Sequence, residues 1–98
     1  MNEPLPDLHE GLLQNAELQQ LFFDLEAVAV VDEVRLKYQT TQYVPENTVT
    51  LAMAYDALTT GDAIGAQVLY RYRSSSWIDT LMRTAEGPVR LIRIQTRR

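Results

Sequence analysis

The chain has 98 residues, of which 46% are hydrophobic, and a formal net charge of −4, values typical of one folded domain over residues 1–98. It has no cysteine, which excludes disulfides, thiolate nucleophiles and zinc–thiolate sites. Its apolar runs are far shorter than the roughly 20 residues that cross a bilayer, and its first residues do not resemble a signal peptide. We therefore expect a cytoplasmic protein with no membrane segment.

The first half of the chain predicts a helix followed by a strand. Pro4 and Pro6 indicate a flexible lead-in over residues 1–7. A helix is expected over about residues 16–26, with Asn15 as a candidate N-cap, because Leu18, Leu21, Phe22 and Leu25 recur at helical spacing. Residues 28–38 alternate in polarity and predict a strand. Residues 39–47 predict a loop, in which positions 43 and 44 can pair briefly at a sheet edge.

The second half predicts a second helix and a strand meander. The helix is expected over about residues 51–59, with Thr50 or Thr48 as its cap and Gly61 at its end. Three strands are expected over about residues 67–73, 77–84 and 89–95, with turns at 74–76 and 85–88. The predicted fold class is α+β, with the element order α-β-α-β-β-β. A four-stranded mixed sheet would carry both helices on one face, and the C-terminal three strands would form a meander.

Charge is sorted along the sequence. Residues 1–65 carry eleven acidic and two basic side chains, a net charge of −9, whereas residues 66–98 carry seven basic and two acidic side chains, a net charge of +5. Such sorting bears on partners rather than on fold. Because the chain is acidic overall and lacks an RNA-recognition type of aromatic motif, nucleic acid is not an expected partner.

The predicted hairpin assigns the arginines of the meander to one face of the sheet. A three-residue loop at positions 74–76 would pair Arg73 with Trp77 and Arg71 with Asp79. The more apolar face is expected to pack on the helices: Val68, Tyr70, Tyr72, Ile78, Thr80, Met82, Ile92 and Ile94. The outer face then forms a candidate interaction surface: Leu69, Arg71, Arg73, Trp77, Asp79, Leu81, Leu91 and Arg93. Arginine and tryptophan are enriched at interaction hot spots, although a solvated face with an ordinary Arg71–Asp79 pair is the alternative.

Catalytic and metal-binding patterns are weak. His9 is the only histidine, the serines at 74–76 have no base near them, and the adjacent Asp32 and Glu33 should point to opposite faces of a strand. Asp32 lies on the apolar phase of its strand, which suggests an arginine partner if it is buried. We assign no catalytic residue, no cofactor and no metal site, and an enzyme is the less favoured interpretation.

Two functions remain from the sequence. The first is an interaction or accessory protein that binds another protein, or itself as a homodimer, through the outer sheet face. The alternative is a small-molecule binder or cryptic enzyme, whose pocket between helices and sheet would be lined by Tyr38, Tyr55, Tyr70 and Tyr72.

Overall fold

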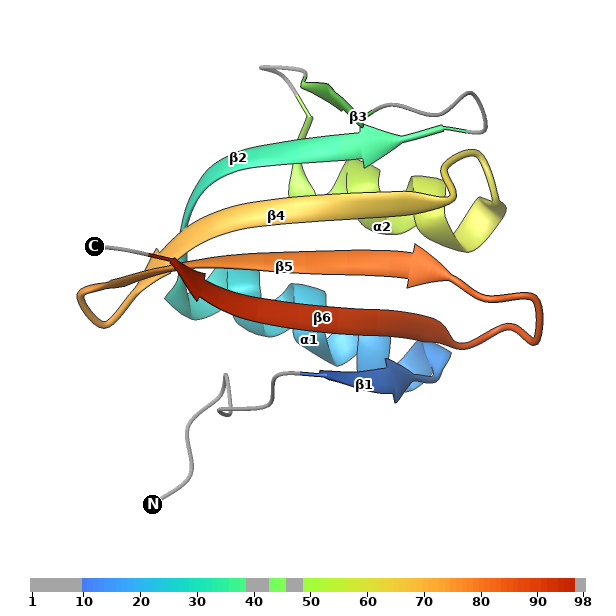
Figure 1. Ribbon diagram of the computed structural model, residues 1–98, viewed down its shortest axis with the longest axis horizontal. Coiled ribbons are helices and arrows are strands. Elements are labelled where there is room, and N and C mark those ends of the chain that lie inside the picture. Colours follow the sequence, from blue (N-terminus) through green and yellow to red (C-terminus); the bar gives the residue numbers. More distant parts are fainter. Residues whose placement is uncertain (1–9, 39–42, 46–48, 97–98) are drawn as a thin grey trace.

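A computed structural model describes residues 10–38, 43–45 and 49–96, with only the backbone of residues 43–45. The predicted lead-in and His9 lie outside these residues. In the described part, an antiparallel sheet carries both helices on one face (Figure 1). The elements follow the order β1–α1–β2–β3–α2–β4–β5–β6. The α+β class and the placement of both helices on one face are thus confirmed.

Local sequence signals place the helices well. Helix α1 (Asn15–Val28) contains the predicted helix and extends two residues beyond its expected end, but its N-cap is Gln14 and not the expected Asn15. Helix α2 (Leu51–Thr60) begins after Thr50, whose hydroxyl accepts a hydrogen bond from the Met53 N–H at 3.1 Å. It ends at Gly61, whose φ of +93° is the left-handed conformation that glycine adopts without strain.

The described strands are β1 (Glu10–Leu13), β2 (Val30–Lys37), β3 (Tyr43–Pro45), β4 (Gly65–Tyr72), β5 (Ser75–Arg83) and β6 (Val89–Thr96). They form a six-stranded sheet in the order β1-β6-β5-β4-β2-β3, and all neighbours are antiparallel. The expected four-stranded mixed sheet is therefore wrong, because β2 and β4 lie antiparallel and the edge strands β1 and β3 add to the sheet. The edge pairing expected at positions 43 and 44 is confirmed.

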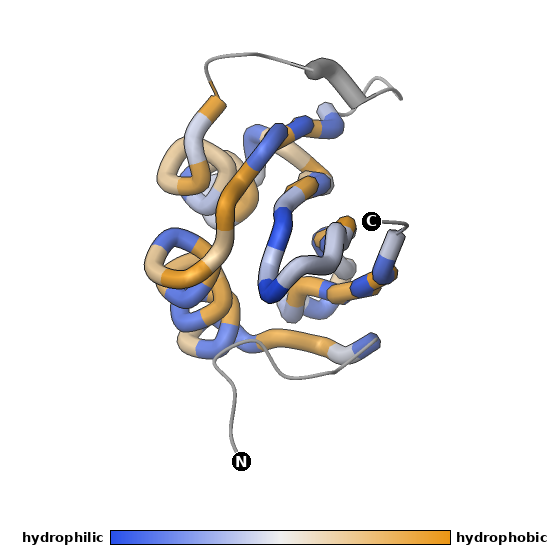
Figure 2. Tube along the Cα trace, turned by 90° about the vertical axis from the view of Figure 1, so that its left-hand side faces the viewer, coloured by the Kyte–Doolittle hydropathy of each residue, from blue (hydrophilic) through white to orange (hydrophobic). Residues whose placement is uncertain are grey.

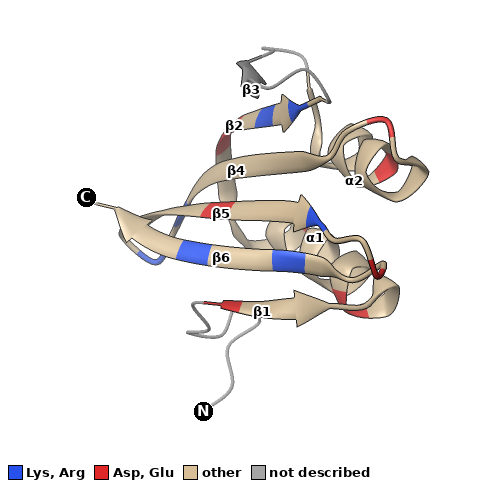
Figure 3. Cartoon of the chain, turned by 45° about the vertical axis from the view of Figure 1, so that its right-hand side comes forward, with Lys and Arg blue, Asp and Glu red and all other residues tan. Residues whose placement is uncertain are grey.

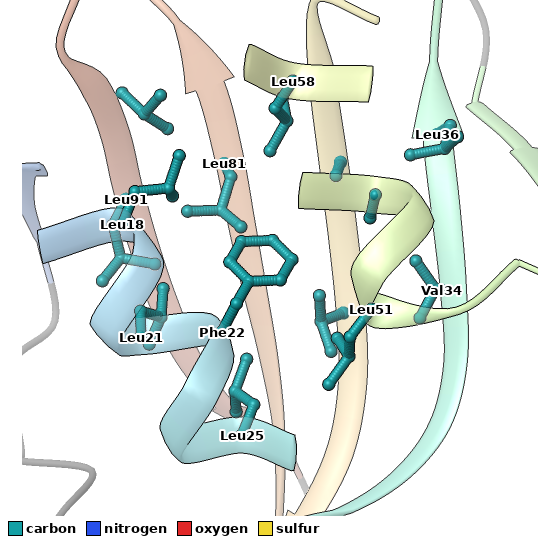
Figure 4. Close-up of a cluster of buried hydrophobic side chains, with 14 of the residues drawn as sticks. Leu18, Leu21, Phe22, Leu25, Val34, Leu36, Leu51, Leu58, Leu81 and Leu91 are labelled. Carbon is teal, nitrogen blue, oxygen red and sulfur yellow. The ribbon is translucent and has the colours of Figure 1, made fainter. Parts of the chain in front are cut away.

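The core lies between the helices and the sheet. Helix α1 contributes Leu18, Leu21, Phe22 and Leu25, and helix α2 contributes Leu51, Ala54 and Leu58. Figure 4 shows these side chains packed against aliphatic residues of the sheet, among them Val34, Leu36, Leu81 and Leu91. Viewed from the side, the helices form one layer and the sheet the other (Figure 2). The apolar stripes of the two predicted helices therefore mark the core correctly.

The β4–β5 hairpin differs from its expected register. Arg73 and Ser74 form a two-residue turn with φ values of +53° and +68°, as in a type I′ turn, so Tyr72 pairs with Ser75. Relative to the expected three-residue loop, the pairing shifts by an odd number of residues, which turns β5 over. Strand β6 pairs with β5, so its side chains are turned to the opposite face as well. The assignment of Val68 and Tyr70 to the helix side is confirmed, whereas the assignments for β5 and β6 are inverted.

Candidate interaction surface

The structure separates the residues of the predicted interaction surface. Leu69 and Arg71 lie on the outer face, and Arg73 lies in the β4–β5 turn. Five others lie on the helix-facing side because of the register shift: Trp77, Asp79, Leu81, Leu91 and Arg93. The expected Arg71–Asp79 pair is also wrong, since Asp79 is opposite Val68 and Arg93.

Asp79 and Arg93 form an ion pair inside the protein. Their exposed fractions are 0% and 3%, and two hydrogen bonds join them: Arg93 Nε to Asp79 Oδ1 at 2.8 Å and Arg93 Nη2 to Asp79 Oδ2 at 2.7 Å. The Tyr70 hydroxyl donates a third bond to Asp79 Oδ1 at 3.0 Å. Burial, followed by the negative charge of Asp79, raises the pKa of Tyr70, which keeps its phenol protonated and able to donate. The bidentate hydrogen bonds between Arg93 and Asp79 offset the cost of burying the two charges.

Trp77 is part of the packing around this cluster. It is opposite Tyr70 on β4 and Gln95 on β6, and it packs partly buried against the hydrophobic core. Its indole Nε1 is buried and has no hydrogen-bond partner among the described residues. Trp77 is therefore not available as a hot spot on the outer face.

The outer face instead presents an apolar row across three central strands. Leu69, Ile78 and Ile94 are direct neighbours on β4, β5 and β6, and Ile94 is 54% exposed. In the next row, the Gln67 side chain donates to the Thr80 hydroxyl at 3.2 Å. The helices lie on the opposite side of the sheet (Figures 1 and 2), so no described element covers this row.

Ion pairs surround the apolar row. Arg71 contacts Asp32 at 2.9 Å, Arg35 contacts Glu33 at 3.0 Å, and Arg90 pairs with Glu10 on the edge strand β1. Figure 3 shows acidic and basic positions on strands of the sheet.

The partner of Asp32 follows from an irregularity in β2. The register between β2 and β4 shifts at Asp32, so a residue on the apolar phase of the sequence reaches Arg71 at the surface. The arginine partner suggested by the sequence is thus present, but the pair is exposed. The hydrogen bonds that Arg71 donates to Asp32 raise the pKa of its guanidinium. Exposed pairs of this kind add little to stability.

The tyrosines of the alternative pocket have structural contacts. Tyr55 donates to Asn15 Oδ1 at 3.1 Å, and its ring packs edge-on against Phe22 with centroids 5.6 Å apart. Tyr70 is bound to Asp79, while Tyr38 and Tyr72 pack partly buried against the core. These contacts give no specific support to a tyrosine-lined ligand pocket.

The described residues show neither a metal-binding cluster nor a membrane-spanning helix. Among the described residues, no cluster of three or more His, Cys, Asp or Glu side chains could hold a metal ion. In the same part of the chain, no helix has the length and apolarity needed to span a membrane. No protein-family model, no curated protein and no solved structure matches the chain.

Proposed function

We propose that this chain is an interaction protein that forms a homodimer through the outer face of its sheet. The observation that carries the proposal is the uncovered row of Leu69, Ile78 and Ile94, bordered by ion pairs. An apolar centre with a polar rim is the usual anatomy of a protein interface. Antiparallel sheets also pack face to face, about 10 Å apart, in many folds.

The charges on this face favour a second copy over a strongly charged partner. Asp32, Glu33 and Glu10 each pair with an arginine of the same chain. A highly basic or acidic partner would have to compete with these internal pairs. An identical face brings apolar groups against apolar groups, as an isologous two-fold interface requires.

The four long strands of the sheet offer an area at the lower end of what such a dimer needs. Strands β2, β4, β5 and β6 contain eight, eight, nine and eight residues. At about 3.4 Å per residue and about 4.8 Å per strand, their outer face measures roughly 27 Å by 19 Å. This is on the order of 500 Å² in flat projection, and accessible area exceeds projected area. A standard interface uses about 800 Å² per partner.

Sedimentation analysis over micromolar to submillimolar concentrations tests the proposal. The wild-type chain should be a dimer, and Ile94→Glu should be a monomer whose free energy of unfolding is nearly unchanged, because Ile94 is exposed. Phe23→Glu is the matched control, since Phe23 is 67% exposed on helix α1 on the other side of the sheet. It should remain a dimer. A wild-type chain that is monomeric at every concentration refutes the homodimer.

A further inference from the structure

An open groove runs between helix α1 and the start of helix α2, on the side of the molecule away from the proposed dimer face. Its volume is about 410 Å³, and its lining includes Phe22, Phe23, Leu51 and Tyr55, with Gln19 and Glu26 at its border. A second hollow of about 350 Å³ shares Glu26, Thr50 and Leu51 with it and continues toward Val31 and Val34. The two hollows adjoin at these shared residues, and the first of them is predominantly apolar.

The groove has a buried floor and an exposed aromatic wall. Phe22 and Leu51 are 6% exposed, whereas Phe23, the next residue along α1, is 67% exposed. Large aromatic side chains that border a hollow are typical anchors of protein interfaces. Phe23 therefore offers contact area that folding of this chain does not use.

The charge on the two helices that line the groove has one sign. Helices α1 and α2 contain Glu17, Asp24, Glu26 and Asp56 and have no Lys, Arg or His. Figure 3 shows acidic positions on both helices. Glu26 borders both hollows. A ligand that fills this groove should combine apolar side chains with positive charge.

We propose that the groove binds an amphipathic helix of a partner protein, with an apolar row flanked by lysine or arginine. An amphipathic helix fits an elongated apolar groove through residues spaced three and four apart. Its cations would face Glu26 and the acidic helix surface. Neither helix of a second copy of this chain is a suitable occupant, because both lack basic residues.

The test uses two model peptides of about 18 residues with the same leucine spacing, one with lysine and one with glutamate at the remaining positions. Their binding to the full chain is measured by isothermal titration calorimetry. The Leu/Lys peptide should bind at least about tenfold more tightly than the Leu/Glu peptide, and Phe23→Ala should weaken it by about tenfold or more. Glu26→Lys should weaken the Leu/Lys peptide and strengthen the Leu/Glu peptide.

Two control variants separate this site from general charge effects and from the dimer face. Asp56→Lys makes the same change of net charge on an exposed residue of α2 that does not line either hollow, and it should affect affinity much less than Glu26→Lys. Ile94→Glu, on the outer sheet face, should leave peptide affinity unchanged. Equal binding of both peptides, equal effects of Asp56→Lys and Glu26→Lys, or indifference to Phe23→Ala would overturn the proposal.

Discussion

Removal of Asp79 should be among the most damaging single substitutions in this protein. The carboxylate is 0% exposed and accepts two hydrogen bonds from Arg93 and one from Tyr70. Asp79→Ala leaves the guanidinium, 3% exposed, without its buried counter-ion. Breaking a buried pair by deleting one partner costs about 3–5 kcal/mol, much of it from the charge that remains. We expect a loss of this size in the free energy of unfolding.

Removing both charges should cost much less than the two single losses together. Arg93→Met should lose about as much as Asp79→Ala, because it leaves the carboxylate buried without the guanidinium. In the double variant Asp79→Ala/Arg93→Met no buried charge of this pair remains. The Tyr70 hydroxyl then lacks its acceptor, at a cost of about 1–3 kcal/mol. The double-mutant cycle should therefore show strong coupling.

Urea unfolding followed by circular dichroism and by the fluorescence of Trp77, the only tryptophan, measures these free energies. Asp32→Ala, which breaks the exposed pair with Arg71, is the control and should have a much smaller effect. If Asp79→Ala loses less than about 1 kcal/mol, or if the two single losses add in the double variant, the buried pair is not as described.

Two further predictions concern pH and the hairpin turn. The pKa of Tyr70 is raised above the 10.0 of an unperturbed tyrosine, so the folded chain keeps a proton that the unfolded chain loses above pH 10. Stability from this residue should be complete below pH 10 and about 1.4 kcal/mol lower at pH 11. Urea unfolding at pH 9 and 11 should show this loss for wild type and not for Tyr70→Phe; equal losses would contradict it. Replacing Arg73 by Asn and Ser74 by Gly should raise the free energy of unfolding by about 1 kcal/mol, because both φ values are positive; a loss in the same urea assay would favour the three-residue loop.

The elements that depend on local signals were predictable from the sequence. For helix α2, the capping residue Thr50, the terminating Gly61 and the apolar stripe all lie within a dozen residues of the sequence. The three-stranded meander was likewise visible as alternating segments between turns. Strand β1 was missed because Leu12 fits an extension of the apolar face of α1. Its strand conformation depends on pairing with Arg90 in β6, far along the chain.

The facing of β5 and β6 was not predictable from alternation, because both phases of these strands contain apolar residues. In β6, Val89 and Leu91 point to the core, but Ile92 and Ile94 on the opposite phase are just as apolar. The turn gave no help, since Arg73 and Ser74 lack the Asn-Gly pattern typical of a two-residue loop. The opposite charges of Asp79 and Arg93 gave no help either, because the expected arrangement already placed both residues on one face of the sheet.

The corrected register also changes how the charge sorting relates to function. The acidic first part of the chain supplies both helices, whose surface has no basic residue to offset Glu26 and its neighbours. The arginines of the last part lie largely in the sheet, where Arg71, Arg90 and Arg93 are paired with carboxylates. One uncovered surface is thus nearly neutral and apolar, and the other is apolar and acidic. Because the sheet separates them, a substitution on one surface should leave binding at the other intact, and the two proposals can be tested independently.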